Sequence, residues 1–349
     1  MRFKTKIKGV RRLGVLLAAV TLTLALLISG SPALSSADEA SSAALCAAEP
    51  KMLIPGGMTF GVRFFTDGVL VVGFAEKGNS PAYAAGLRIG DVVLKVDGKE
   101  LRGAEDLTDA IEKSGGRSVE LYCRRDKADF TVKITPRADE KGKYKAGMWV
   151  RDGGAGIGTV TYIDPATGAF GGLGHGICDA DTGKPLPLGR GVVLGVNISG
   201  ITKGSVGAPG EIKGYFESSK LGAVIKNTDC GVFGIYSEIP KTSYGAMPIA
   251  SAKEVKEGAA KILCTLDSGQ MHEYSVELYS IDRSASGGRC FSVKVTDADL
   301  LAITGGIVQG MSGSPIIQNG KLVGAVTHVL VSDPTAGYGI FIENMLARE

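Results

Sequence analysis

Short runs of hydrophobic residues alternate with polar turn residues along the second half of this chain. The runs are rich in β-branched and aromatic side chains and are separated by Gly, Asp and Pro. They fall at 156–164, 191–199, 231–237, 259–266, 272–281, 291–297, 322–331 and 338–342. This pattern predicts many short strands arranged as a β-sandwich or barrel, with an Asn319-Gly320 hairpin turn and a short final helix at 343–348.

Residues 53–136 have a mixed pattern. Strand-like runs fall at 69–74, 91–98, 118–125 and 127–136. Helical spacing falls at 80–87 and again at 104–114, where Leu107, Ala110 and Ile111 share one face. The pattern predicts a compact α+β unit, followed by a charged linker at 137–146 and a main domain at 147–349.

The N-terminus reads as an export segment. Residues 1–12 carry six Lys or Arg and no acid, and an apolar run from Leu13 to Ile28 follows. Residues 1–37 are therefore predicted to be a signal peptide or a membrane anchor helix, and 38–52 a tether. Basic residues before the run place the rest of the chain on the far side of the membrane.

Composition narrows the class of protein. The chain is 44% hydrophobic and 21% charged, with 51 glycines and 6% aromatics, which favours a globular, mainly β protein. Its net charge of +3 becomes −3 without residues 1–37, so a nucleic-acid partner is excluded. Six widely spaced cysteines include no CxxC pair and are interpreted as buried thiols or unassigned bridges.

The α+β unit carries a specific signature. Ser80-Pro81-Ala82, Ala85-Gly86-Leu87, Gly90-Asp91-Val92-Val93 and Val96-Asp97-Gly98 together resemble the core of PDZ domains. Such domains add an extended peptide to a sheet edge beside a helix and hold its C-terminal carboxylate with backbone N–H groups. The resemblance implies that Thr59, Phe60, Gly61 and Val62 form that carboxylate loop.

Candidate catalytic residues lie in two glycine-rich stretches. His175, one of three histidines, sits in Gly-Gly-Leu-Gly-His-Gly. Ser312 lies in QGMSGSP, a turn in which the N–H groups of Gly310 and Ser312 could form an oxyanion hole, with Ser314 as its structural neighbour. The pair predicts a serine nucleophile with a histidine base.

The third member of a triad is ambiguous by spacing. Asp229 lies 54 residues after His175 and 83 before Ser312, close to the His-Asp-Ser spacing of chymotrypsin-type enzymes. His328 follows the nucleophile on a run that could pair with a substrate. It is either an ordinary strand residue or part of a specificity pocket.

Long motifs at 147–164, 170–183, 227–234 and 304–340 make nearly the whole chain resemble the SpoIVB-type serine peptidases of endospore-forming bacteria. The resemblance implies a membrane signal, a PDZ domain and a chymotrypsin-like double β-barrel peptidase domain. It places the catalytic residues on His175, Asp297 and Ser312, which disagrees with the spacing that favours Asp229. Asp179 and Asp299 are further candidates for the aspartate in the sequence.

The same resemblance implies a role in sporulation. It predicts an endopeptidase exported across the forespore membrane into the intermembrane space and anchored until it cuts itself. Its substrate would be a regulatory membrane protein that restrains an intramembrane protease, so that cleavage permits processing of a sigma-factor precursor. The PDZ domain would bind chain ends, including the protein's own N-terminal segment.

Other chemistries fit less well. HExxH is absent, so no metal is expected, and neither glycine-rich segment matches a phosphate-binding loop. Cys178 lies close to His175 without an oxyanion turn. No cofactor is required for the predicted reaction. The alternative is a membrane-tethered PDZ scaffold whose peptidase-like domain is not catalytic.

Overall fold

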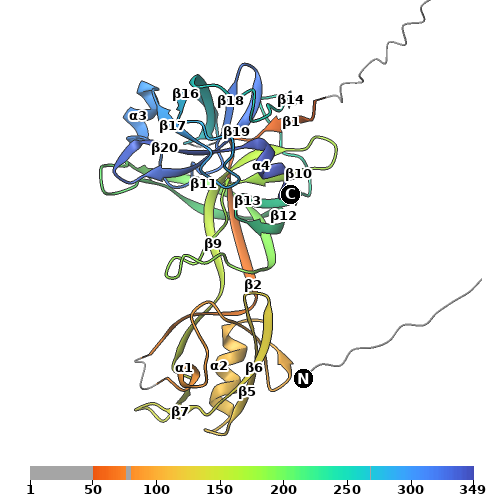
Figure 1. The fold of residues 1–349 in the computed structure, drawn as a ribbon, viewed down its shortest axis with the longest axis vertical. Helices are drawn as coiled ribbons and strands as arrows, with labels where there is room; N and C mark the ends of the chain where they lie inside the picture. Colours follow the sequence, from red (N-terminus) through yellow and green to blue (C-terminus); the bar gives the residue numbers. More distant parts are fainter. Residues whose placement is uncertain (1–49, 76–79, 268) are drawn as a thin grey trace, which may run out of the picture. The chain divides into compact units, whose positions relative to one another are not determined.

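The computed structural model describes residues 50–75, 80–267 and 269–349 (Figure 1). The predicted signal or anchor at 1–37 and nearly all of the tether lie outside the described residues. No helix within the described ranges is long and apolar enough to cross a membrane. The described residues are mainly strand, as the sequence predicted.

The first barrel is a ring of six antiparallel strands. Its order is β9, β10, β13, β12, β11 and β2, and the additional pairing of β2 with β9 completes the ring. The strands are β2 (Thr59–Phe74), β9 (Met148–Ile163), β10 (Ala169–Gly172), β11 (Leu188–Thr202), β12 (Glu211–Thr228) and β13 (Gly231–Tyr236). Two short strands, β1 (Met52–Pro55) and β14 (Met247–Pro248), extend the sheet beside β9. Phe60 and Phe170 pack edge to face in its core.

The second barrel is closed and also has six strands, in the order β15, β16, β17, β20, β19 and β18. They are β15 (Gly258–Thr265), β16 (Met271–Tyr279), β17 (Phe291–Val295), β18 (Pro315–Gln318), β19 (Lys321–Leu330) and β20 (Asp333–Phe341). Helix α3 (Ala298–Thr304) follows β17, and α4 (Ile342–Leu346) follows β20. The predicted hairpin turn is confirmed, because Asn319 and Gly320 both have positive φ.

A separate hydrophobic core is formed by residues 69–146, which lie in the chain between the first strand of the first barrel and its other strands. It is built on the C-terminal part of β2 and on α1 (Pro81–Ala84), β3 (Val92–Val96), α2 (Ala104–Lys113), β5 (Val119–Arg125) and β6 (Ala128–Ile134), and exposed β4 (Lys99–Glu100) pairs with β3. A small sheet of β7 (Arg137–Ala138) and β8 (Tyr144–Lys145) follows. The Gly-Asp motif has a structural role, since buried Asp91 pairs with Arg125 and accepts the Arg88 N–H.

The predicted domain boundary at 53 is wrong. Strand β1 and the first half of β2 pair with β9, β11 and β14, so they belong to the first barrel. The α+β unit is an insertion between β2 and β9, which run side by side into it (Figure 1).

Candidate active site

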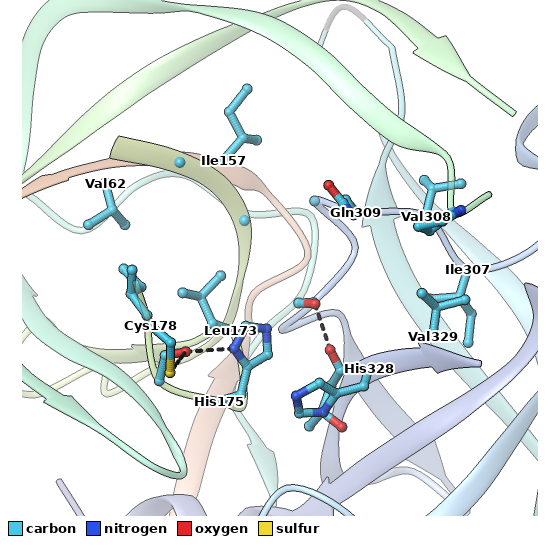
Figure 2. Close-up of a pocket in the computed structure, with 18 of the residues that line it drawn as sticks. Val62, Ile157, Leu173, His175, Cys178, Ile307, Val308, Gln309, His328 and Val329 are labelled. Atoms are coloured by element: carbon cyan, nitrogen blue, oxygen red, sulfur yellow. Dashed lines mark hydrogen bonds between the residues drawn. The ribbon is translucent and has the colours of Figure 1, made fainter. Parts of the chain in front are cut away.

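One cleft of about 560 Å³ contains both predicted catalytic residues, His175 and Ser312 (Figure 2). Gly310 and His328 line it as well. None of its lining residues is Asp, Glu, Lys or Arg. The side chains of Ile307, Val308 and Val329 lie on one side of the two histidines, and those of Val62, Ile157 and Leu173 lie on the other.

His175 follows strand β10 in a tight turn. Leu173 and Gly174 both have positive φ, and the leucine there is a strained conformation of the kind that clusters at functional sites. His175 Nδ1 lies 2.9 Å from the carbonyl oxygen of Gly176. A carbonyl only accepts, so Nδ1 carries the hydrogen and Nε2 keeps its lone pair. Burial lowers the pKa of His175, which favours the neutral base.

Asn227, on β12, fixes the backbone just beyond His175. Its Oδ1 accepts the Ile177 N–H at 2.8 Å, and its Nδ2 donates to the carbonyls of Ile177 and Leu186 at 2.9 and 3.0 Å. Sequence reasoning did not single out Asn227. Its only signal was its place in the NTDCGVFG motif, which drew attention to the neighbouring aspartate instead.

Ser312 lies in the turn that precedes β18. Its Oγ donates to the carbonyl oxygen of Thr327 at 2.6 Å, so the single hydroxyl hydrogen is engaged there and not with His175. This bond must be released before Oγ can donate to the imidazole. Ser314 is fully buried and lies outside the cleft lining, in keeping with a structural position.

The turn also presents two free backbone donors. Gly310 and Gly313 have φ of 100° and 97°, values that L side chains rarely adopt. In the part of the chain that the structure describes, the N–H groups of Gly310 and Ser312 have no hydrogen-bond acceptor, whereas their neighbours in the turn do. They are the two donors that the sequence predicted for an oxyanion hole.

The structure does not bring Asp297 to the cleft. Asp297 is the N-cap of α3, where its carboxylate accepts the N–H groups of Asp299 and Leu300 and, on the other oxygen, that of Ser275. It is absent from the cleft lining, and its helix-capping bonds hold it in the second barrel. The predicted third role for Asp297 is not supported by this geometry.

The rival aspartates are also engaged elsewhere. Asp229 is exposed and pairs with Arg348 at 3.4 Å, and Asp299 lies exposed in the first turn of α3. Asp179 is buried, and Arg151 binds it at 2.6 Å. None of these carboxylates lines the cleft.

His328 is the other imidazole of the cleft. Its ring lies 4.8 Å from that of His175, tilted by 34°. Its Nδ1 is buried and has no partner among the described residues. Burial, followed by the influence of His175 and Arg289, lowers the pKa of His328 to about 4, so it is neutral at pH 7. His328 lines the cleft, which is the position that a pocket residue would take, and its role stays a prediction.

The predicted PDZ carboxylate loop is wrong in its position. Thr59, Phe60, Gly61 and Val62 lie within β2, paired with β9 on one side, and Gly61 and Val62 are also paired with β11 on the other. Phe60 and Val62 are buried in the first barrel's core. Paired and buried backbone cannot accept a peptide end.

A groove of about 340 Å³ lies in the α+β unit instead. Leu107, Thr108 and Ile111 of α2 form one wall, and residues 144–150 form the other. There β9 pairs with β2 along one edge, which leaves its other edge facing α2. An edge beside a helix is the arrangement that PDZ domains use to add a peptide strand.

The cysteines of the described residues are free thiols. Cys123, Cys230, Cys264 and Cys290 are buried, and Cys178 is exposed in the cleft. Partial desolvation in the cleft raises the pKa of the Cys178 thiol, so a thiolate nucleophile is disfavoured. No cluster of metal-binding side chains was found within the described ranges.

Comparison with known proteins finds relatives of the α+β unit and of the peptidase domain. Curated relatives match short segments. A putative zinc metalloprotease of Bartonella henselae is 37% identical over 106 residues, 29% of this chain and 28% of that protein. Serine protease HTRA1 of Xenopus tropicalis is 36% identical over 62 residues, 18% of this chain and 13% of that protein. The chain therefore spans less than a third of these relatives.

Two solved structures are similar over parts of the chain. The active form of the Rv3671c protease of M. tuberculosis has a TM-score of 0.33 at 15% identity, over 56% of this chain and 72% of that one. The PDZ domain of an SdrC-like protein of Listeria monocytogenes has a TM-score of 0.22 at 24% identity, over 24% of this chain and 87% of that one.

Family models match more of the chain. A PDZ domain model matches residues 76–125. The SpoIVB peptidase S55 model matches residues 142–346, which is more than half of the chain and includes both His175 and Ser312. The chain therefore belongs to the SpoIVB peptidase S55 family of serine peptidases.

Proposed function

We propose that this protein is an exported serine endopeptidase of sporulation that cuts itself and a regulatory membrane protein. Cleavage of that protein would release an intramembrane protease to process a sigma-factor precursor. The observation that carries the catalytic part is the shared cleft, in which a neutral imidazole and a serine hydroxyl accompany two free backbone N–H groups.

The chemistry follows from these groups. His175 Nε2 accepts the Ser312 proton as Oγ forms a bond to the scissile carbonyl carbon, and the Gly310 and Ser312 N–H groups stabilise the resulting oxyanion. The imidazolium then returns its proton to the leaving amine, and an acyl-enzyme remains. Water, activated by the same imidazole, hydrolyses the acyl-enzyme and restores Ser312.

The cleft also suggests a substrate preference. Its lining is uncharged and has aliphatic side chains on both sides of the two histidines, so apolar residues next to the scissile bond gain burial there, whereas a charged side chain loses hydration without an ionic partner. We infer cleavage beside Val, Leu or similar residues. The groove at α2 and β9 supports binding of a peptide end, either of the protein's own N-terminal segment or of the partner.

A non-catalytic scaffold is the competing function, and one observation favours it: Ser312 Oγ is bonded to the Thr327 carbonyl rather than to His175. A serine-directed fluorophosphonate separates the two functions. The enzyme is expected to be labelled, with labelling lost in Ser312→Ala and retained in Ser314→Ala. A folded wild-type protein that takes up no label would refute the catalytic proposal.

Self-cleavage needs its own assay. N-terminal sequencing of the purified full-length chain is expected to reveal cleavage in the segment that precedes β1, which begins at Met52. Ser312→Ala and His175→Ala are expected to abolish this cleavage. Cleavage that proceeds at the wild-type rate in both variants would assign the cut to another protease.

A further inference from the structure

The nucleophile turn is held by an uninterrupted series of hydrogen bonds to its carbonyl groups. All five carbonyls from Gln309 to Gly313 accept one. The donors, in order, are the Ile212 N–H, the Thr159 Oγ1, the Ser314 N–H, the Thr159 N–H and the Thr161 Oγ1. Their donor to acceptor distances range from 2.7 to 2.9 Å.

Strand β9 supplies three of these five bonds. The Thr159 hydroxyl donates to the Gly310 carbonyl at 2.7 Å, its N–H donates to the Ser312 carbonyl at 2.9 Å, and the Thr161 hydroxyl donates to the Gly313 carbonyl at 2.8 Å. Both threonines are fully buried. Residues two apart on a strand face the same side, which is why both hydroxyls reach one turn.

These bonds decide where the turn's N–H groups point. A trans peptide is planar, so each N–H is directed opposite to the C=O of the residue before it. The free N–H groups therefore share their peptides with the carbonyls of Gln309 and Met311, and Thr159 holds the two peptides that flank the Met311–Ser312 peptide. With every carbonyl held, the N–H groups of Gln309, Met311, Gly313 and Ser314 donate within the protein. Gly310 and Ser312 alone in this turn keep free N–H groups, on the basis of the described residues, and both residues line the cleft.

The weak point of the turn is Gly310. Its φ of 100° lies where glycine moves easily, so the peptide that follows it can rotate if its carbonyl loses its donor. A buried carbonyl without a partner costs free energy, which drives such a rotation. The rotation would shift Met311 and with it the Ser312 N–H.

We propose that Thr159 and Thr161 are positioning residues that set the oxyanion hole, with Thr159 dominant because it holds the carbonyls on both sides of Met311. This inference rests on the proposed serine peptidase function. Neither threonine contacts the substrate; each acts through the backbone of the nucleophile turn.

The test compares Thr159→Val with Thr159→Ser. Valine keeps the shape and removes only the hydroxyl donor, whereas serine keeps the donor. With an apolar peptide substrate, Thr159→Val is expected to lower kcat by about tenfold to a hundredfold, less than the hundredfold or more lost with a whole oxyanion donor. Its KM is expected to change by less than about twofold, because ground-state binding does not use the hole. Thr159→Ser is expected to recover most of kcat.

Thr265→Val is the matched control. Thr265 is also a buried strand threonine whose hydroxyl donates to a backbone carbonyl, that of Gly57, at 3.0 Å, outside the nucleophile turn. It should lose similar stability and keep its kcat. The proposal is overturned if Thr159→Val keeps wild-type kcat, or if Thr265→Val loses as much.

A second readout does not depend on activity. In full-length chains that also carry Ser312→Ala, amide hydrogen exchange across 309–314 is expected to be faster with Thr159→Val than with Thr265→Val. Equal exchange in the two variants would overturn the positioning role. If the wild type neither hydrolyses peptide nor takes up fluorophosphonate, the proposed function fails, and the exchange comparison still decides the role of Thr159.

Discussion

Replacing Asn227 with alanine removes three hydrogen bonds, two of which hold Ile177, just beyond His175. The amide side chain satisfies both the N–H and the C=O of Ile177 and also the C=O of Leu186. No other side chain in the described residues bonds to Ile177. Asn227 therefore couples the stability of the first barrel to the position of the catalytic base.

The size of the effect follows from these bonds. Each hydrogen bond contributes about 1 kcal/mol net, and a buried group left unsatisfied costs about 1 to 3 kcal/mol. Asn227 is only half-buried, so water can reach part of the vacated space. We expect Asn227→Ala to lower the free energy of unfolding by about 2 to 3 kcal/mol. We also expect kcat to fall by about tenfold or more, because a misplaced base loses the benefit of orientation.

Urea unfolding followed by circular dichroism gives the first quantity, and peptide hydrolysis well below the unfolding transition gives the second. Asn197→Ala is the control, since Asn197 is an exposed strand asparagine whose side chain makes no hydrogen bond within the described residues. A variant that loses the expected stability and keeps wild-type kcat would show that Asn227 supports the fold without placing His175.

Four further outcomes are expected. Because burial lowers the pKa of His175, the acid limb of kcat/KM should fall below the ordinary imidazole value of about 6.5, and a limb above that value would contradict the burial argument. The lowered pKa of His328 means that the unfolded chain binds its proton first, so stability should decline as pH falls from about 6.5 toward 4, and His328→Leu should flatten that decline in a pH series of urea midpoints. Asp297→Asn preserves a helix cap, so kcat should stay within about threefold of wild type, whereas a loss of about 10⁴ would put Asp297 in the triad after all. Asp91→Asn breaks the pairing with half-exposed Arg125 and should destabilise the α+β unit by about 2 kcal/mol in thermal scans while Ser312 remains reactive to fluorophosphonate.

The local pattern of hydrophobic, polar and turn residues predicted much of the secondary structure. Alternation and turn residues identified most strands, and the Asn-Gly turn and α2 appeared where their signals predicted them. The local pattern could not show that the α+β unit is inserted between β2 and β9. Periodicity reports the conformation of a segment, whereas the pairing of Thr59 with Thr159 joins residues about a hundred positions apart. The pattern of hydrophobic positions placed the boundary too early, at residue 53, because both domains share strand β2 and local pattern does not show what each half of it pairs with.

The site was predictable where chemistry restricts the residue type. A nucleophile in a glycine-rich turn and a histidine between glycines are uncommon, and the structure brings Ser312 and His175 into one cleft. Aspartate is a common helix cap as well as a triad member, so Asp297 could not be assigned from its place in the chain. The roles of Thr159 and Asn227 depend on the segments that they face, and polar strand residues carry no such information by themselves.

The shared strands determine how the PDZ insertion can be removed. Deleting 53–136 would take away β1 and all of β2, and with them one of the six strands of the first barrel, so such a chain should not fold.

Leu70 and Arg151, however, are paired across β2 and β9, and an Asn-Gly turn can join them in place of 71–150. This excision keeps Leu70 in the barrel core. It also keeps the ion pair between Arg151 and buried Asp179, which lies four residues after His175. The excised chain should therefore fold and react with fluorophosphonate at Ser312, and it should cleave short apolar peptides while losing selectivity for substrates that present a free chain end to the groove at α2. If it folds but no longer reacts, the insertion is needed to arrange the catalytic groups, and β9, which runs from that groove to Thr159, is the strand through which it would act.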